Sequence, residues 1–578
     1  MKKLLFFLVL LSISCENANN ASKFDFETIF EKSEGKETAT YKKTINYFLE
    51  LAKSYSEISI QEIGETDSGN PLHIVTLNPD AEFNFDEIRI QKRIILINNG
   101  IHPGESDGID ATMMLFRDIV QEKVKLPKKT VLVTIPIYNV GGSLNRNSGT
   151  RANQNGPEEY GFRGNARNYD LNRDFIKSDT KNAKTFAKIF HLVKPDVFID
   201  NHVSNGADYQ YTLTHLFTQH NKLGDKLGDF LHTKMQPELE QKLLNQNWDI
   251  TPYVNVWNST PEKGFSQFFD NSRFSTGYTT LFNCLGMMVE THMLKPYKQR
   301  VEGTYAFMNS MIEVVEENAD TIKTIRDEKP LLMQKQKNYV LEWEVDTTKT
   351  SSLNFKGYEG KMVASEVTGA SRLKYDRTKP FTKEVIYQNY FKPKTEIEIP
   401  SFYIIPQGWH NVIELLKLNQ VEFNRLEKDS TITVESYRIS DYKTRTNAYE
   451  GHYPHYNTKV ETLTKDITFY KGDYIIPVRQ YAFRYLMETL EPTAPDSFFN
   501  WNFFDTVLQK KEHFSPYVFE DTAKQMLNEN PELKANFITK KVKDEKFAAN
   551  WYEQLNWLYK HSVHYEKTFL HYPVYKVN

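Results

Sequence analysis

The 578-residue sequence has only two cysteines, Cys15 and Cys284, so it cannot build the multiple disulfides that hold many small extracellular domains together. It also lacks a strong net charge, because 72 basic residues nearly balance 75 acidic ones and leave a formal charge of -3. Proteins that bind nucleic acid usually carry a marked positive excess. We therefore expect a fold that is stabilised by packing, and no nucleic-acid partner.

Long apolar runs are equally scarce, and the clearest one lies at the start of the sequence. Lys2 and Lys3 precede the apolar stretch 4–11, and small residues lead to Cys15. This order is typical of an export signal, and the stretch is too short to span a bilayer. The segment resembles a bacterial lipoprotein signal, in which the cysteine at the cleavage point is lipidated.

This resemblance implies a signal peptide over residues 1–14, a lipid on Cys15 and a polar tether over 15–23. We therefore expect an exported lipoprotein that is anchored to a membrane on its periplasmic or cell-surface side. Ordinary cleavage and release is the alternative.

The length indicates more than one domain, because a single core stops growing at roughly 250 to 300 residues. In residues 24–325, apolar runs that are typical of buried strands alternate with helical patterns; the runs are 94–97, 131–137, 197–199 and 285–289. This alternation predicts an α/β domain whose mixed, mostly parallel sheet is covered by helices on both faces.

After residue 330 the pattern changes to short segments of alternating polarity, at 339–345, 395–405 and 430–439. These segments predict a β-rich accessory region over 330–475. Residues 476–578 are expected to be helical, and Phe547, Trp551, Leu555 and Leu558 would mark one apolar helix face.

Four residues suited to metal chemistry follow predicted strands of the first domain. His102 and Glu105 come just after the strand 94–97, His202 after 197–199, and Glu290 after 285–289. Ligands of open α/β sheets bind at the carboxyl ends of the strands, so the four side chains should share one edge.

Two imidazoles and one carboxylate leave the fourth position of a tetrahedral zinc ion open to water, as in catalytic zinc sites. We therefore predict that His102, Glu105 and His202 hold one zinc ion per chain. Glu290 is the candidate general base that accepts a proton from the attacking water.

Residues 40–310 resemble the zinc carboxypeptidases related to carboxypeptidase A. The resemblance rests on His102-Pro-Gly-Glu105, on the segment Arg163-Gly-Asn-Ala-Arg-Asn-Tyr-Asp170-Leu-Asn172-Arg173-Asp174, on His202, and on Glu290-Thr291. It implies a carboxypeptidase-like fold and the removal of terminal residues from peptides with a free C-terminal carboxylate.

The same resemblance implies roles for four further residues. Arg163, Asn172 and Arg173 would bind the substrate carboxylate, and Arg163 would also polarise the scissile carbonyl. Guanidinium groups suit this task, because their donors match a carboxylate in geometry and charge. Asp170 would orient the first zinc histidine through its other ring nitrogen.

The resemblance also implies a mobile tyrosine upstream of the catalytic glutamate. Tyr278 is the best candidate by position, although its spacing to Glu290 is short, and Tyr253 is its rival. The pair Asn145-Arg146 imitates Asn172-Arg173, but it lacks the accompanying arginine and aspartate.

Three other interpretations stay open. The site suits an amidase that acts on cell-wall peptides or on another carboxylate-bearing amide, and it suits a lipoprotein that binds peptides or glycans without catalysis. Residues 330–578 are alternatively a scaffold for a surface complex. The histidines of 451–456 favour an aromatic turn over a second metal site.

Overall fold

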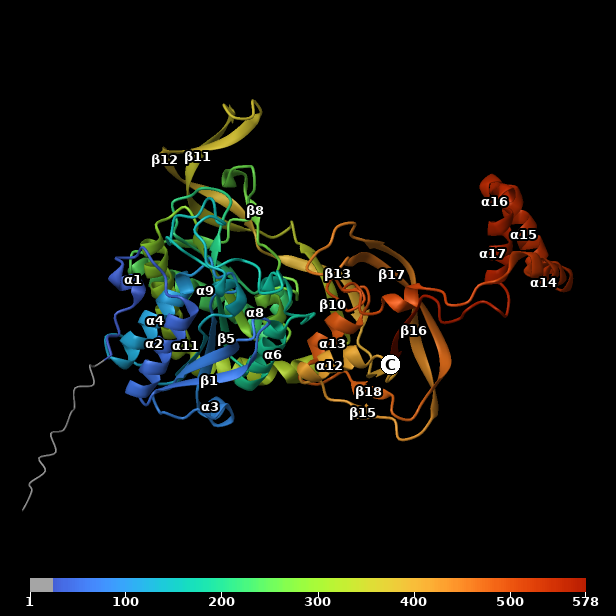
Figure 1. Ribbon diagram of the computed structural model, residues 1–578, viewed down its shortest axis with the longest axis horizontal. Helices are drawn as coiled ribbons and strands as arrows, with labels where there is room; N and C mark the ends of the chain where they lie inside the picture. The colour runs from blue at the N-terminus through green and yellow to red at the C-terminus, as the bar shows by residue number, and fades with distance from the viewer. Residues whose placement is uncertain (1–23) are drawn as a thin grey trace, which may run out of the picture.

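The computed structural model describes residues 24–578, so the expected signal peptide, Cys15 and the tether lie outside the described residues. No helix in the described part combines the length and the apolar character that crossing a bilayer requires. Figure 1 shows the α/β domain, the β-rich region beside it and a small helical lobe set apart from both.

The α/β domain is built on an eight-stranded sheet whose central strands β4, β3, β5 and β9 are parallel to one another. In spatial order the strands are β1 (Ile58–Glu65), β2 (Pro71–Leu77), β4 (Thr130–Ile135), β3 (Arg93–Asn98), β5 (Val197–Ser204), β9 (Leu285–His292), β6 (Leu213–Phe217) and β7 (Ile250–Pro252). This arrangement confirms the expected mixed, mostly parallel sheet.

Helices cover both faces of this sheet, because its central strands are apolar on both sides. Ile94 and Leu96 of β3 belong to one core, whereas Ile95 and Ile97 belong to the other. One face is covered by α3 (Phe85–Gln91), α6 (Lys181–Val193) and α10 (Ser275–Thr280). The other is covered by α2 (Tyr41–Ser54), α4 (Asp107–Val120), α9 (Gln236–Asn245) and α11 (Tyr297–Met333).

Shorter helices complete the domain. They are α1 (Ile29–Lys32), α5 (Val140–Leu144), η1 (Leu171–Arg173), α7 (His220–Leu223), α8 (Asp225–Phe230), η2 (Leu231–Met235) and η3 (Pro261–Lys263). Helix α6 shows how the sequence sets the limits of a helix: the Thr180 hydroxyl caps its first turn, and Lys194 ends it in the left-handed region.

The β-rich region joins the α/β domain through both strand pairing and a shared core. Strands β11 (Ser351–Ala364) and β12 (Ser371–Gln388) form a long hairpin, and β12 pairs with β8 (Phe265–Ser266) of the first domain. A second pair consists of β10 (Asn338–Val345) and β13 (Phe391–Glu398). Buried residues of α6 and of α13 (Phe483–Leu490) belong to one continuous core.

A six-stranded sheet contradicts the expected boundary at residue 475. Its order is β15 (Asn424–Arg425), β18 (Tyr474–Pro477), β14 (Phe402–Ile405), β19 (His571–Val577), β16 (Ser430–Thr444) and β17 (His455–Phe469), with α12 (His410–Leu418) beside it. Residues 476–578 are therefore not a separate helical region, since β19 lies between β14 and β16. Pairing from both sides holds β19 in place, and neither partner is near it in sequence.

Residues 516–560 form the helical lobe, which has a small core of its own. Its helices are α14 (Pro516–Glu529), α15 (Pro531–Lys543), α16 (Glu545–Ala549) and α17 (Trp551–Lys560), and η4 (Asp505–Leu508) precedes it. The expected single face through Phe547, Trp551 and Leu555 is wrong, because Asn550 ends α16 and caps α17. Trp551 is consequently 64% exposed.

Candidate active site

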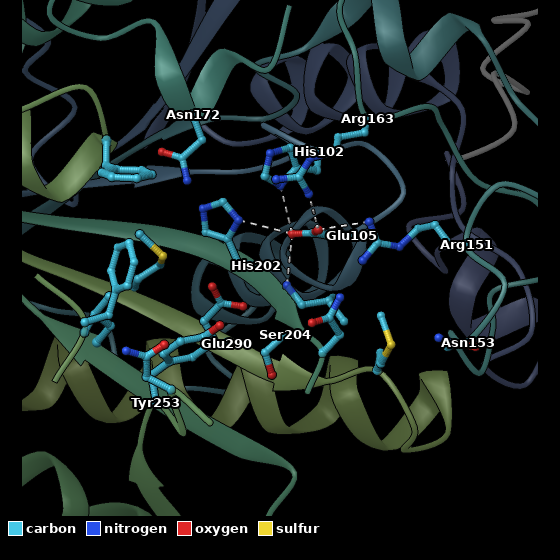
Figure 2. A pocket seen from close by; sticks show the side chains of 18 of the residues that line it. His102, Glu105, Arg151, Asn153, Arg163, Asn172, His202, Ser204, Tyr253 and Glu290 are labelled. Carbon is cyan, nitrogen blue, oxygen red and sulfur yellow. Dashed lines mark hydrogen bonds and ion pairs between the residues drawn. The ribbon is translucent and has the colours of Figure 1, made fainter. Parts of the chain in front are cut away.

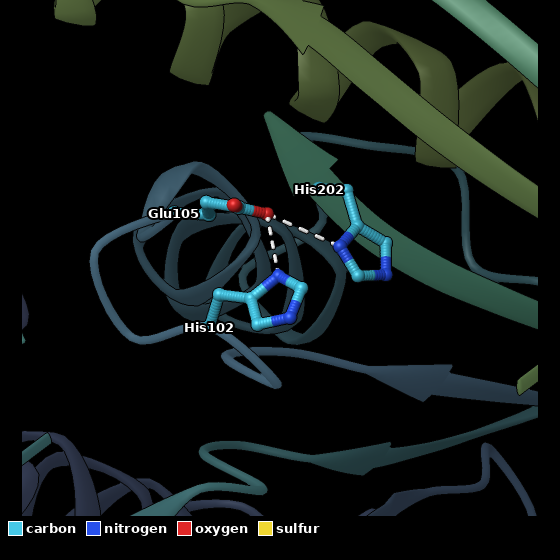
Figure 3. A group of neighbouring side chains, drawn as sticks. All are labelled: His102, Glu105 and His202. Carbon is cyan, nitrogen blue, oxygen red and sulfur yellow. Dashed lines mark hydrogen bonds and ion pairs between the residues drawn. The ribbon is translucent and has the colours of Figure 1, made fainter. Parts of the chain in front are cut away.

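Three buried side chains meet at the carboxyl end of the central strands. His102 and Glu105 lie on the loop between β3 and α4, and His202 lies within β5. Glu105 Oε2 is 3.2 Å from His102 Nδ1 and 3.1 Å from His202 Nδ1 (Figure 3). One atom from each residue lies within 4.8 Å of the others, so the three can hold a single metal ion.

Two further carboxylates fix the orientation of the imidazoles. The Nε2 of His102 lies 2.9 Å from Asp170 Oδ1, and the Nε2 of His202 lies 2.9 Å from Asp200 Oδ2. Each carboxylate accepts a hydrogen bond from Nε2–H, so in the neutral imidazole each Nδ1 carries a lone pair that faces Glu105. His102 Nδ1 has no hydrogen-bond partner within the described chain.

The surrounding charges favour a cation at the point where these groups meet. Burial alone would lower the pKa of His202, but Asp200, Glu105 and Glu290 raise it well above its ordinary value. Two imidazole lone pairs and a carboxylate are a suitable ligand set for zinc. The donor set and its field therefore both fit the zinc ion that the sequence predicts.

Asp200 is a part of the site that the sequence reasoning missed. It precedes His202 by two residues on β5, and side chains at this spacing point to the same face of a strand. That spacing is the signal that would have identified it. Asp170, in contrast, lies where the resemblance implied.

Glu290 lies across from His202, because β5 and β9 pair in register at these two residues. Both side chains line a cavity of about 500 Å³, together with His102 and Glu105. Burial, with the nearby carboxylates of Glu105 and Asp200, raises the pKa of Glu290 to about 8. A divalent cation in the site would lower this pKa, because it adds an opposite charge.

The expected carboxylate-binding residues line the same cavity (Figure 2). Arg163 pairs with Asp170, with Nη2 2.8 Å from Oδ2, and remains 45% exposed. Asn172 accepts the Ser275 N–H through Oδ1, which leaves its amide NH2 to donate elsewhere. The Arg173 guanidinium lies 4.5 Å above the centre of the Phe274 ring.

Arg151 also lines the cavity, although no motif in the sequence pointed to it. Its Nη1 is 3.0 Å from Glu105 Oε1, and Arg163 Nη1 is 3.5 Å from the same oxygen. The two arginines therefore bring positive charge to Glu105 Oε1, whereas the two imidazoles face Oε2.

The structure contradicts the expected role of Tyr278. Its side chain is fully buried in the aromatic core around Phe186 and Phe190, and its hydroxyl donates to Asn419 at 2.6 Å. Tyr278 faces this core from α10, and it is not among the residues that line the cavity. Tyr253, which follows β7, lines the cavity instead (Figure 2).

The two other ambiguous motifs lie outside the cavity. Arg146 donates to the main-chain oxygen of Glu159. The histidines of 451–456 bond to separate carboxylates, with His452 on Asp179 and His455 on Asp505. Neither histidine belongs to a metal-binding group in residues 24–578.

Asp270 is a second residue that the sequence reasoning missed. It is buried, it lines the cavity, and its Oδ1 has no partner within the described part of the protein. Burial raises the pKa of Asp270 to about 6. Apolar side chains line the cavity alongside it, namely Leu216, Phe268, Phe274 and Met288.

Comparison with known proteins points to one family. Residues 44–195 match the family model described as zinc carboxypeptidase. Carboxypeptidase 2 of Trichophyton rubrum is 21% identical over 491 residues, which cover 81% of this chain and 84% of that protein. Carboxypeptidase 2 of Trichophyton equinum is 20% identical over the same length and the same shares of both chains.

Solved structures give a weaker likeness. A putative carboxypeptidase A from Shewanella denitrificans is 17% identical, with a TM-score of 0.37, over 49% of this chain and 69% of that one. The family match covers the segment with His102, Glu105 and Asp170, and the Trichophyton relatives extend over most of the chain. Residues 44–195 thus match the zinc carboxypeptidase family, and most of the chain is similar to the Trichophyton carboxypeptidases.

Proposed function

We propose that the protein removes C-terminal residues from peptides, with zinc held by His102, Glu105 and His202 and with Glu290 as general base. One observation carries this proposal. The three-ligand cluster, the separate carboxylate of Glu290 and a group of arginines all line the same cavity.

A zinc ion at this point supplies Lewis acidity, which polarises a carbonyl and lowers the pKa of water towards about 7. Glu290 then accepts the proton of the attacking water and delivers it to the leaving amine. Its partly buried position on β9, opposite His202, suits both transfers. Asp170 and Asp200 hold the imidazoles in the tautomer that this chemistry needs.

The arginines explain why the enzyme would select the C-terminal residue of a peptide substrate. Arg163, Asn172 and Arg173 offer donors to the free carboxylate of a peptide. Tyr253 lines the same cavity and replaces Tyr278 as the tyrosine that contacts the substrate.

Asp270 supports a narrower substrate class, namely peptides that end in lysine or arginine. Its unpartnered Oδ1 lies among apolar side chains, which suit the methylene stem of a basic residue. Oδ2 accepts a hydrogen bond from the Thr276 hydroxyl, and a cationic head group would give Oδ1 the partner that it lacks.

The test compares free-acid peptides with their C-terminal amides in a mixed library, alongside measurement of the metal content. One zinc per chain and cleavage of the free acids alone would support the proposal. Bound zinc without cleavage would favour amide substrates of another kind, such as cell-wall peptides. A chain that takes up no zinc would favour a binding protein and would overturn the proposal.

We also propose that Cys15 anchors the protein to a membrane on the outer side of the cell, on the strength of the sequence alone. Cells that express the protein should incorporate labelled palmitate into it, and Cys15→Ser should abolish the label. A soluble, unlabelled wild type would overturn the anchor.

A further inference from the structure

A tight turn of the β-rich region touches the catalytic segment 163–179. We call residues 445–454, which connect β16 to β17, the clasp loop. Glu450 Oε2 accepts the main-chain N–H of Asp170 at 2.8 Å, and His452 Nε2 lies 2.8 Å from Asp179 Oδ2. The contact thus joins residues that are about 280 positions apart in the sequence.

Asp170, which Glu450 contacts, has several roles in the site. The side chain of Asp170 holds His102 through Oδ1 and Arg163 through Oδ2. Glu450 takes the main-chain N–H of the same residue, so it fixes the backbone from which these two bonds are made. A shift of this backbone would move a zinc ligand and a substrate-binding arginine together.

The segment on either side of Asp170 is held to the clasp loop as well. Lys177 is fully buried and pairs with Asp179 at 2.6 Å, and Asp179 in turn contacts His452. Gly451 lies so close to the Tyr169 hydroxyl that an added Cβ would collide with it. The clasp loop therefore fits the catalytic segment closely at three points.

The backbone of the clasp loop is unfavourable for a glutamate. Tyr449 and His452 exchange both main-chain hydrogen bonds around Glu450 and Gly451, whose φ values are 49° and 78°. Two positive φ values are typical of a type I′ turn, which favours Asn, Asp or Gly at its first central position. Local turn chemistry therefore does not explain Glu450, whereas its reach to Asp170 does.

We propose that the β-rich region completes the catalytic centre, with Glu450 as a positioning residue that orients His102 and Arg163 through the Asp170 main chain. This inference rests on the proposed zinc site. It gives residues 330–578 a role in catalysis itself, in place of the scaffold that their sequence also allowed.

The decisive variant is Glu450→Asn in the full-length protein. Asparagine suits the turn at least as well as glutamate, but its side chain is one methylene shorter. We expect the fold to keep its thermal midpoint while the zinc dissociation constant, measured by chelator competition, rises about tenfold, in line with other residues around metal ligands. The kcat/KM on a free-acid peptide should fall by a similar factor.

Two companions complete the experiment. Glu450→Gln retains an oxygen at the same reach and should keep zinc affinity near that of the wild type. Glu427→Gln alters an exposed glutamate of the same region and should change nothing. A Glu450→Asn protein that binds zinc and turns over like the wild type would overturn the inference. A merely structural role would lower the thermal midpoint and leave zinc affinity unchanged, which also overturns it.

The outcome is separable from that of the proposed function. If the wild type takes up no zinc, the proposed function fails and Glu450 has no zinc site to position. If the wild type binds zinc and cleaves peptides while Glu450→Asn is indistinguishable from it, only the positioning role fails.

Discussion

The side chain of Glu290 gives the most direct prediction about chemistry. Glu290→Gln keeps the size of the side chain but removes the base, and general acid–base catalysis typically contributes about 10²- to 10⁴-fold. We therefore expect kcat to fall by about that factor, whereas zinc content should stay at one per chain. Steady-state kinetics and metal analysis of the same preparation would measure both. Undiminished turnover would remove Glu290 from the mechanism.

The carboxyl group of Asp270 leads us to predict that the preference for a C-terminal lysine depends on pH. Its carboxyl has a pKa of about 6, so it is ionised at neutral pH and becomes neutral as the pH falls below that value. The ratio of kcat/KM for a peptide ending in lysine to that for the same peptide ending in leucine should be constant above about pH 7 and fall below pH 6. Using the ratio cancels the titration of groups that both peptides share.

Asp270→Asn should lower the same ratio at neutral pH by about 30-fold or more, because truncating one partner of a buried charge pair costs roughly 2 kcal/mol or more. The pH dependence of the ratio should disappear in this variant. An unchanged ratio would show that another group recognises the terminal side chain.

The sequence predicted the residues whose role follows from strand ends and short motifs. His102, Glu105, His202 and Glu290 come together as expected, since each follows or closes an apolar strand. Tyr278 was misplaced, because spacing along a loop and a short helix does not determine which face turns inward. Asp270 and Arg151 carry no motif, and only the fold brings them to the cavity.

The close packing of helix α4 against the sheet predicts that its first turn does not tolerate a larger side chain. Gly108, in its first turn, lies against Asn201 and Asn99, and an added Cβ would come closer to both than real Cβ atoms do. Gly108→Ala should therefore lower the free energy of unfolding by about 1–3 kcal/mol, the usual cost of overpacking. It should also weaken zinc binding, because α4 follows Glu105 and Asn201 precedes His202.

Gly149→Ala is the matched control, since no atom of residues 24–578 outside the adjoining chain lies within 4 Å of the added methyl group. Denaturant unfolding and chelator competition would compare the two variants. Equal stability of both would show that the start of α4 can shift without cost.

The elements of the α/β domain followed from apolar runs and helical periods, but the extent of the β-rich region did not. Strand β19 was missed because a sequence pattern does not reveal partners that lie about 140 to 170 residues upstream. The long hairpin of β11 and β12 pairs with β8 in the first domain, so strand pairing also crosses the expected domain boundary. The change in sequence pattern at residue 330 therefore does not mark a boundary between two independent domains, because strand pairing connects the two parts.

The complete chain is expected to tolerate loss of the helical lobe but not of the clasp loop. Replacing residues 513–564 by two glycines should leave zinc affinity and kcat/KM within about twofold of the wild type, because the lobe has its own core and lies apart from the α/β domain, whose residues line the cavity. Activity assays of this deletion and of Glu450→Asn would show separately what the helical lobe and the clasp loop contribute to catalysis. A loss of activity in the deletion would place the lobe in the catalytic machinery.

The neck of that lobe has a consequence for how the protein could change over evolutionary time. The Glu566 carboxylate accepts the main-chain N–H groups of Lys511 and Glu512, so the chain leaves and re-enters the β-rich region at one point. An insertion with adjoining ends can be gained, lost or exchanged without altering the register of β19. The lobe is thus a replaceable attachment, and it could adapt to new surroundings while the catalytic centre stays as it is.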